Sequence, residues 1–201
     1  MAGIPKTTKE DIIKAAYEIV RKKGIENLNA RALAKELKCS TQPIMYQFSS
    51  MEEIKKEVLQ KAIETYKSYI SKGINEEFAY KSMGYNYIRL AKEEPNIYKL
   101  VFSTKTNLTV ENFMLEDRFY EEIEKAISKR TKMDKDAILS FHKKMWLLTH
   151  GIASLIADKT CSFTDEEIDM FLTEEFVALM KLEEFKKTDE WKKMISSKSK
   201  K

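Results

Sequence analysis

The sequence predicts an all-α protein of about nine helices, arranged in two parts. Only 5 Gly and 3 Pro occur among 201 residues, which favours long helices joined by short turns. Apolar residues recur every three or four positions along most of the chain, and no alternating strand pattern or internal repeat is found. Apolar residues make up 43% of the sequence, enough to bury a core.

The first two helices are expected within residues 7–38. Thr7 or Thr8 can cap the first helix with its hydroxyl, and Gly24 is a suitable stop because glycine adopts a left-handed turn at little cost. Asn29 can cap the second helix, whose apolar face extends from Ala30 to Leu37. The two helices can therefore pack closely through small side chains.

A third helix is expected after a three-residue turn at Lys38-Cys39-Ser40. Ser40 or Thr41 can cap it, and Pro43 lies in its first turn, where a missing N–H does no harm. Ile44 and Phe48 point inward at i, i+4 spacing. The outer face is then formed by Thr41, Gln42, Pro43, Tyr46 and Gln47.

A fourth helix is expected to begin after Ser50, which forms a capping-box pattern with Glu53, and to end near Gly73. Further helices are expected over residues 75–94, 96–103, 109–131, 134–158 and 165–187. The predicted organisation is a domain of short helices over 1–50, a connecting helix over 51–73, a second helical domain over 74–187 and a basic tail over 188–201.

The charge is concentrated at the two ends of the chain. The net charge is +4, with 11 basic against 8 acidic residues over 1–60 and 7 against 2 over 186–201. This pattern allows contact with nucleic acid, although lysine-rich surfaces are often only solvated. No apolar stretch is long enough to span a membrane, and no signal-peptide core is found. We therefore expect a cytoplasmic protein.

Two short helices joined by a tight turn and braced by a third helix are typical of helix-turn-helix geometry. The glutamines of the outer face can bond adenine edges, and its threonine and proline can contact a thymine methyl group. Arg31 is placed to reach a phosphate or a guanine, while Thr8 and Lys55 can hold the DNA backbone on either side. The alternative is a three-helix bundle with a polar surface, because fold alone does not fix function.

Residues 15–62 resemble the DNA-binding domain of the TetR family of transcriptional regulators. The resemblance rests on the stop at Gly24, the segment ARALAKEL, the segment STQPIMYQF and the MEEI start of the fourth helix. It implies that Arg31 and the outer face of the third helix contact DNA. Met45 and Met51 depart from the family, which often has an aromatic residue and a lysine at these positions.

The second half of the chain is similar to one TetR-type C-terminal domain, the Trp–His–Gly subtype. This similarity rests on SMGYNYIRLAKEEPNIYKLVF at residues 82–102 and on WLLTHGIASLIA, which contains Trp146, His150 and Gly151. It implies a ligand pocket among the middle helices and a homodimer formed by the last two helices.

The residues allow both features. Aromatic and adaptable side chains that could line a pocket are Tyr66, Tyr85, Phe102, Phe113, Phe119, Met145 and Trp146. Apolar residues that could form a four-helix dimer interface are Ile152, Ile156, Phe171, Phe176 and Leu179. Both sets could equally fill an intramolecular core. We expect His142 to face solvent, His150 to be a hydrogen-bonded core residue, and the effector to be apolar or an aromatic cation.

The sequence offers little support for an enzyme. It contains no HExxH, CxxC or P-loop, the two cysteines match no metal spacing, and no cofactor or metal is expected. The predicted function is a homodimeric repressor that a small hydrophobic or aromatic ligand releases from a palindromic operator. The alternatives are a helix-turn-helix protein that responds to a protein partner or to no effector, and, more remotely, an all-α enzyme.

Overall fold

The protein is all-α in a computed structural model that describes residues 7–75, 77–102, 109–115, 117 and 119–198. Over these residues the chain forms eleven α-helices and one 3-10 turn, and no strand. The predicted fold class is therefore confirmed. None of the helices in the described ranges has the length and apolar character that crossing a membrane requires.

The N-terminal bundle, residues 7–50, begins with α1 (Lys9–Lys23). The Thr8 hydroxyl accepts the Asp11 N–H at 3.1 Å, and the Asp11 carboxylate accepts the Thr8 N–H at 3.0 Å, which caps the helix as predicted. Gly24 ends α1 with a φ of +88°, a left-handed conformation that glycine adopts without strain. The 3-10 turn η1 (Ile25–Asn27) follows.

Two short helices complete this bundle. Asn29 accepts the Ala32 N–H at 3.0 Å and so caps α2 (Ala30–Glu36). The helix α3 (Thr41–Gln47) begins after Ser40. Ile44 and Phe48 are buried beneath α3, as expected, with 0% and 3% of their surface exposed.

The helix α4 (Met51–Ser71) connects the two parts of the molecule. Ser50 accepts the Glu53 N–H at 3.2 Å, but the Glu53 carboxylate accepts the N–H and hydroxyl of Ser49, so the expected capping box is shifted by one residue. The buried stripe of α4 contains Ile54, Val58, Ala62 and Ile70. Its first half packs on α1, and it also contacts α5 and α6.

The C-terminal bundle differs from the prediction in two places. Its helices are α5 (Ala79–Glu93), α6 (Pro95–Phe102), α7 (Val110–Leu115), α8 (Tyr120–Ser128), α9 (Lys135–Ala157), α10 (Asp165–Phe185) and α11 (Asp189–Lys198). The single helix expected over 109–131 is two helices, because Asp117 accepts the backbone N–H groups of Phe119 and Tyr120 and ends the helical pattern. The expected tail forms α11, which Thr188 caps through the Trp191 N–H.

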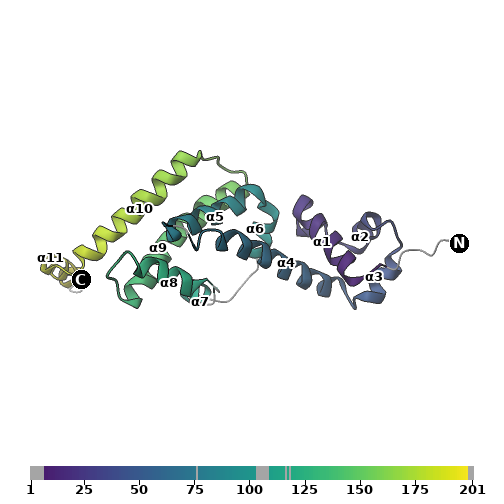
Figure 1. The fold of residues 1–201 in the computed structure, drawn as a ribbon, viewed down its shortest axis with the longest axis horizontal. Helices are drawn as coiled ribbons and strands as arrows, with labels where there is room; N and C mark the ends of the chain where they lie inside the picture. The colour runs from purple at the N-terminus through teal and green to yellow at the C-terminus, as the bar shows by residue number, and fades with distance from the viewer. Residues whose placement is uncertain (1–6, 76, 103–108, 116, 118, 199–201) are drawn as a thin grey trace.

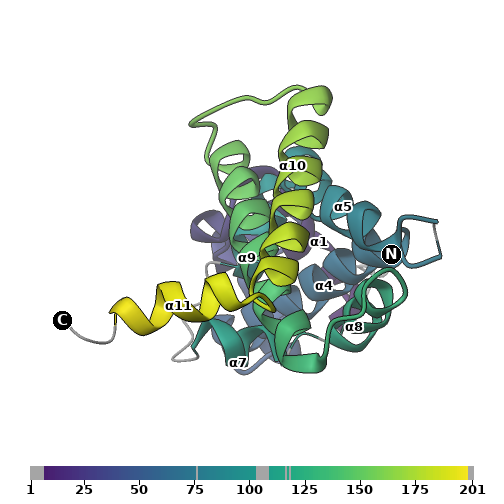
Figure 2. The same cartoon turned by 90° about the vertical axis from the view of Figure 1, so that its left-hand side faces the viewer.

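The molecule is elongated, with α1–α3 at one end and α10–α11 at the other (Figure 1). The helix α4 leads from the N-terminal bundle into the C-terminal bundle, where α5 packs extensively on α9. Figure 2 shows α9 and α10 side by side, with α11 leaving the end of α10. A continuous set of buried apolar side chains extends from Ile12 to Leu179.

Candidate functional site

The outer face of α3 is polar, uncharged and accessible. Tyr46 is 78% exposed, and its hydroxyl accepts a hydrogen bond from the Gln42 amide at 3.0 Å. Thr41 is also exposed and Pro43 is half-buried. Because Ile44 anchors the opposite side in the core, α3 offers this face as a fixed surface.

Gln47 differs from the other residues predicted for this face. Its amide donates to the backbone carbonyl of Thr7 at 3.3 Å, and the side chain is half-buried. Gln47 therefore ties the end of α3 to the segment before α1 in the free protein.

The residues predicted to flank α3 differ in whether their side chains already bond to other residues of the protein. Arg31 is exposed in the first turn of α2. Thr8 is exposed, but its hydroxyl is engaged with Asp11, donating to the carboxylate at 2.7 Å and lowering the pKa of that carboxyl. Lys55 lies 3.5 Å from Glu52 on the same helix. Met45 is 40% exposed beside Tyr46.

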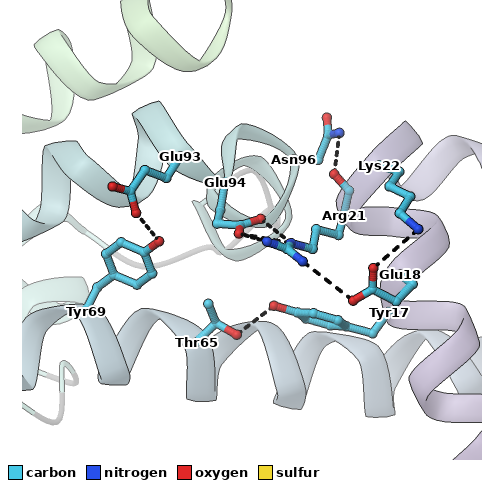
Figure 3. A network of polar contacts seen from close by, with 9 residues as sticks. All are labelled: Tyr17, Glu18, Arg21, Lys22, Thr65, Tyr69, Glu93, Glu94 and Asn96. Atoms are coloured by element: carbon cyan, nitrogen blue, oxygen red, sulfur yellow. Dashed lines mark hydrogen bonds and ion pairs between the residues drawn. The ribbon is translucent and has the colours of Figure 1, made fainter.

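Polar side chains join the two bundles at the far end of α1 (Figure 3). The Arg21 guanidinium of α1 donates to both carboxylate oxygens of Glu94, at 2.9 and 2.7 Å from Nε, and this contact raises the pKa of Arg21. Asn96 donates to the Arg21 carbonyl at 2.9 Å. The start of α6 is therefore fixed against α1.

A second joint lies along α4 (Figure 3). The hydroxyls of Tyr17 and Thr65 are 2.7 Å apart. One turn further along α4, the Tyr69 hydroxyl donates to Glu93 at 2.7 Å, and burial together with this carboxylate raises the pKa of Tyr69 to about 12. The same helix is thus bonded to α1 and to the end of α5.

A cavity of about 630 Å³ lies between α4, α5, α8, α9 and α10. This volume is within the range of small-molecule sites in proteins. Three of the seven residues predicted to line a pocket are on its wall, namely Tyr66, Met145 and Trp146.

Of the other four predicted pocket residues, Tyr85, Phe102 and Phe119 are not on this wall. Phe102 and Phe119 pack edge-on against the ring of Tyr66, with ring centres 5.3 and 6.1 Å away. Tyr85 donates to the backbone carbonyl of Asp165. Phe113 belongs to α7, and its side chain is outside the described part of the structure. Helical spacing predicts that these side chains point inward, but it does not predict which neighbours they contact.

Polar groups that the sequence did not single out also line the cavity. The Tyr66 hydroxyl donates to Asp117 at 2.7 Å, and burial raises the pKa of Asp117. Glu122 and Tyr80 lie on the same wall. Asp117 and Glu122 are ordinary members of an acidic helix start in the sequence, so no local signal distinguishes them.

His142 was expected to face solvent, and this expectation is wrong. Its side chain is 8% exposed, lines the cavity and shares a hydrogen bond of 3.0 Å with the Tyr80 hydroxyl. The helix α9 is buried over more than one face because α5, α8 and α10 all pack on it. His150 is half-buried, and its Nδ1 lies 2.8 Å from the Tyr87 hydroxyl and 3.0 Å from that of Tyr98.

The residues predicted for a dimer interface are divided between core and surface. Ile152 and Leu179 are 5% and 6% exposed and belong to the core of the chain. Ile156 and Phe176 are half-buried, and Phe176 packs against Phe141 and lines the cavity. Phe171 alone among the five is exposed, at 37%.

The N-terminal bundle is similar to one family of known proteins. Residues 12–58 match the model for bacterial regulatory proteins of the tetR family, and this part of the predicted resemblance is confirmed. No curated protein matches the sequence.

Two solved structures resemble most of the chain in fold. One is a putative transcriptional regulator of the TetR family from Vibrio parahaemolyticus, with 17% identity, a TM-score of 0.58 and coverage of 84% of this chain and 96% of its own. The other is the multidrug binding protein EbrR in complex with imidazole, with 16% identity, a TM-score of 0.53 and coverage of 86% and 90%. The family model that residues 12–58 match is one of regulatory proteins.

The buried His142 predicts a specific loss of stability in acid. Burial lowers the pKa of His142 to about 4, from an ordinary value of 6.5. The unfolded chain therefore takes up the proton first, and the free energy of unfolding falls as the pH drops from about 6.5 to about 4, by up to roughly 3 kcal/mol. Urea titrations of the wild type and of His142→Asn, which keeps a hydrogen-bonding group but does not titrate, measure this effect.

The difference between the two proteins should shrink as the pH falls through this range. His150→Asn is the control, because His150 is only half-buried and should give a smaller change. Parallel pH profiles for the wild type and His142→Asn would contradict the assignment.

Proposed function

We propose that this chain, which residues 12–58 place among the DNA-binding regulators of the tetR family, is a cytoplasmic homodimeric repressor released from its operator by a small hydrophobic or aromatic ligand. The observation that carries the proposal is the connection between an exposed α3 and a ligand-sized cavity through one helix. Tyr66 of α4 lines the cavity, while Ile54 and Val58 of the same helix are buried in the core next to α1.

DNA recognition is assigned to α3. Gln42 and Tyr46 lie on its exposed side, where an amide can bond adenine and a flat ring can contact a thymine methyl or a sugar. Arg31 is the charged anchor for a phosphate or a guanine. Gln47 would have to release Thr7 before it could read a base, so we assign it a secondary role.

The dimer interface is assigned to the exposed sides of α9 and α10. Five large apolar side chains on these helices are between 37% and 51% exposed: Leu147, Leu155, Met170, Phe171 and Val177. Gly151 lies between the first two on α9, and a side chain added there would meet nothing within the protomer. Two such helices from each protomer would form a four-helix interface, which refines the residues expected from sequence.

A dimer of this kind would place two copies of α3 in successive major grooves, about 34–36 Å apart. A ligand in the cavity would displace Tyr66 on α4, and the N-terminal bundle would follow because α4 packs on α1. A changed separation of the two α3 helices lowers affinity for a palindrome. Couplings of about 1–3 kcal/mol are ordinary for such transitions.

The first test concerns DNA reading. We expect Tyr46→Ala to weaken binding to an operator, selected from random DNA by the wild type, by about tenfold or more, since a lost base contact costs about 1–3 kcal/mol. Arg31→Ala should weaken binding to all sequences and reduce the salt dependence of log K by about one. Gel shifts and salt titrations measure both effects.

Lys192→Ala is the control for Arg31, because it also removes one exposed positive charge and lies on α11, at the other end of the molecule from α3 (Figure 1). It should leave DNA binding unchanged. Equal affinity of the wild type for selected and shuffled DNA at physiological salt would refute a sequence-specific regulator.

The second test concerns the dimer. Val177→Asp introduces a charge into the proposed interface and should convert a dimer into monomers that remain folded, because an unpaired charge is costly to bury. Light scattering after size exclusion measures the mass. Val110→Asp on α7 is the control, since Val110 has nearly the same exposure, 42% against 44%. A wild type that is monomeric at micromolar concentration, or a dimeric Val177→Asp, would contradict the assignment.

The third test concerns the joint between the bundles. Glu94→Gln removes the ion pair with Arg21 and should let the N-terminal bundle take more than one position. We therefore expect the variant to lose most of its discrimination between the selected operator and one with an extra central base pair. Gel shifts with the two DNAs give this ratio.

Asp158→Asn is the control for this joint, because it breaks a surface pair between α6 and the end of α9, Lys99–Asp158 at 3.0 Å. It should keep the discrimination of the wild type. Full discrimination by Glu94→Gln would show that the joint does not set the spacing.

A further inference from the structure

The cavity has an acidic interior, because the described residues form no ion pair with two carboxylates on its wall, Asp117 and Glu122. Glu122 of α8 lines it, and one carboxylate oxygen of Glu122 is buried with no hydrogen-bond partner among the described residues. Burying an oxygen of a carboxylate without a partner is costly. A buried orphan of this kind calls for an explanation, such as a ligand that supplies the missing partner.

A second carboxylate lies near Glu122. Asp117 also lines the cavity, and its oxygens accept from the Tyr66 hydroxyl at 2.7 Å and from the Phe119 N–H at 2.9 Å. Burial raises the pKa of Asp117, and the charge of Glu122 raises it further. The two carboxylates therefore act on each other across the same wall.

Of the four described lysines and arginines on the cavity wall, three form ion pairs with residues other than Glu122 and Asp117. Their ion pairs are Lys81–Asp169, Lys125–Glu121 and Arg130–Glu77. Arg130 also lies over the ring of Phe78, 4.3 Å from its centre. Lys125, Lys129 and Arg130 are exposed, so these cations lie at the solvent side of the cavity rather than against Glu122.

Aromatic rings form part of the wall, among aliphatic side chains such as Ile123, Ile127 and Leu172. Tyr66, Tyr87 and Trp146 line the cavity, with Tyr66 and Tyr87 in edge contact at 6.1 Å and Trp146 stacked on His150 at 4.6 Å. Ring faces attract cations and pack flat apolar bodies. Aromatic rings beside carboxylates complement a cationic ligand better than a neutral or an anionic one.

We propose that the cavity selects an organic cation with a flat apolar body, whose positive group lies against Glu122 and Asp117 and whose rings pack on Tyr66, Tyr87 and Trp146. This rests on the proposed function and deepens it by naming the ligand class. The positive charge of the ligand would offset the charges of Glu122 and Asp117 on the wall. A neutral molecule of the same shape fills the same volume and leaves that carboxylate as it is.

Three tricyclic probes of nearly equal size test the charge preference: 10-methylacridinium as the cation, acridine as the neutral form at pH 7.5, and acridine-9-carboxylate as the anion. Calorimetry on the full-length protein gives their affinities. We expect the cation to bind at least tenfold more tightly than acridine, and the anion to bind more weakly than both.

The carboxylates are tested by Glu122→Gln. This variant should lose at least fivefold in affinity for 10-methylacridinium while its affinity for acridine stays within twofold. Asp117→Asn, which keeps the acceptor for the Phe119 N–H, should also lower the affinity for 10-methylacridinium. It provides a second test of the carboxylates if Glu122→Gln does not fold. Glu121→Gln is the matched control, because Glu121 is the neighbouring carboxylate on α8 and its side chain is 84% exposed.

Gel shifts with the same probes separate this inference from the proposed function. Cation binding that depends on Glu122 but leaves DNA affinity unchanged supports the ligand class and refutes release by this site. Equal or tighter binding of acridine or of the anion, accompanied by release of DNA, supports the regulator and overturns the cation preference. The absence of any binding by 10-methylacridinium, or an affinity unaffected by both carboxylate variants, overturns it as well.

Discussion

The structure depends on the continuity of α4 (Met51–Ser71). One uninterrupted helix of 21 residues buries Ile54 and Val58 in the core beside α1, and brings Tyr66 to the cavity wall two turns later. No glycine or proline interrupts it, so it has no cheap point at which to bend. A displacement at Tyr66 therefore cannot be absorbed inside the helix. It must appear as a movement of α4 against α1, α5 or α6, which are the elements packed on it.

Features that depend on contacts between residues close in sequence could be predicted, whereas features that depend on contacts between distant residues could not. Thr8, Asn29 and Gly24 act on groups within four residues, so the limits of α1 and α2 could be predicted from the sequence. The break at Asp117 depends partly on Tyr66, 51 residues away, and no local pattern contains that contact. His142 was misplaced for the same reason, since its burial comes from helices packed on α9 rather than from its own neighbours in sequence.

The candidate sites show the same limit. The outer face of α3 is fixed by one helix turn, and Thr41, Gln42 and Tyr46 are exposed as expected. A cavity between five helices requires knowledge of which faces meet. Of the predicted residues whose side chains the structure describes, Tyr66, Met145 and Trp146 reach it. Hydrophobic spacing also favours aromatic residues over acidic ones as pocket candidates. Asp117 and Glu122, the groups that give this cavity its charge, were therefore invisible to that criterion.

Two chains of contacts connect the cavity to α1, and their interaction energies are similar in size to the coupling that a ligand-driven switch requires. One runs along α4 to the Tyr17–Thr65 contact. The other runs through Tyr87 and His150 to Tyr98 on α6, and from the start of α6 through Glu94 to Arg21. A partly exposed ion pair contributes about 0.2–1 kcal/mol, and a neutral hydrogen bond about 1 kcal/mol. A switch worth about 1–3 kcal/mol needs contacts that hold the resting position and yet yield to one ligand. The two bundles also share a continuous apolar core, so these polar contacts are the part of the joint that a coupling of this size can rearrange.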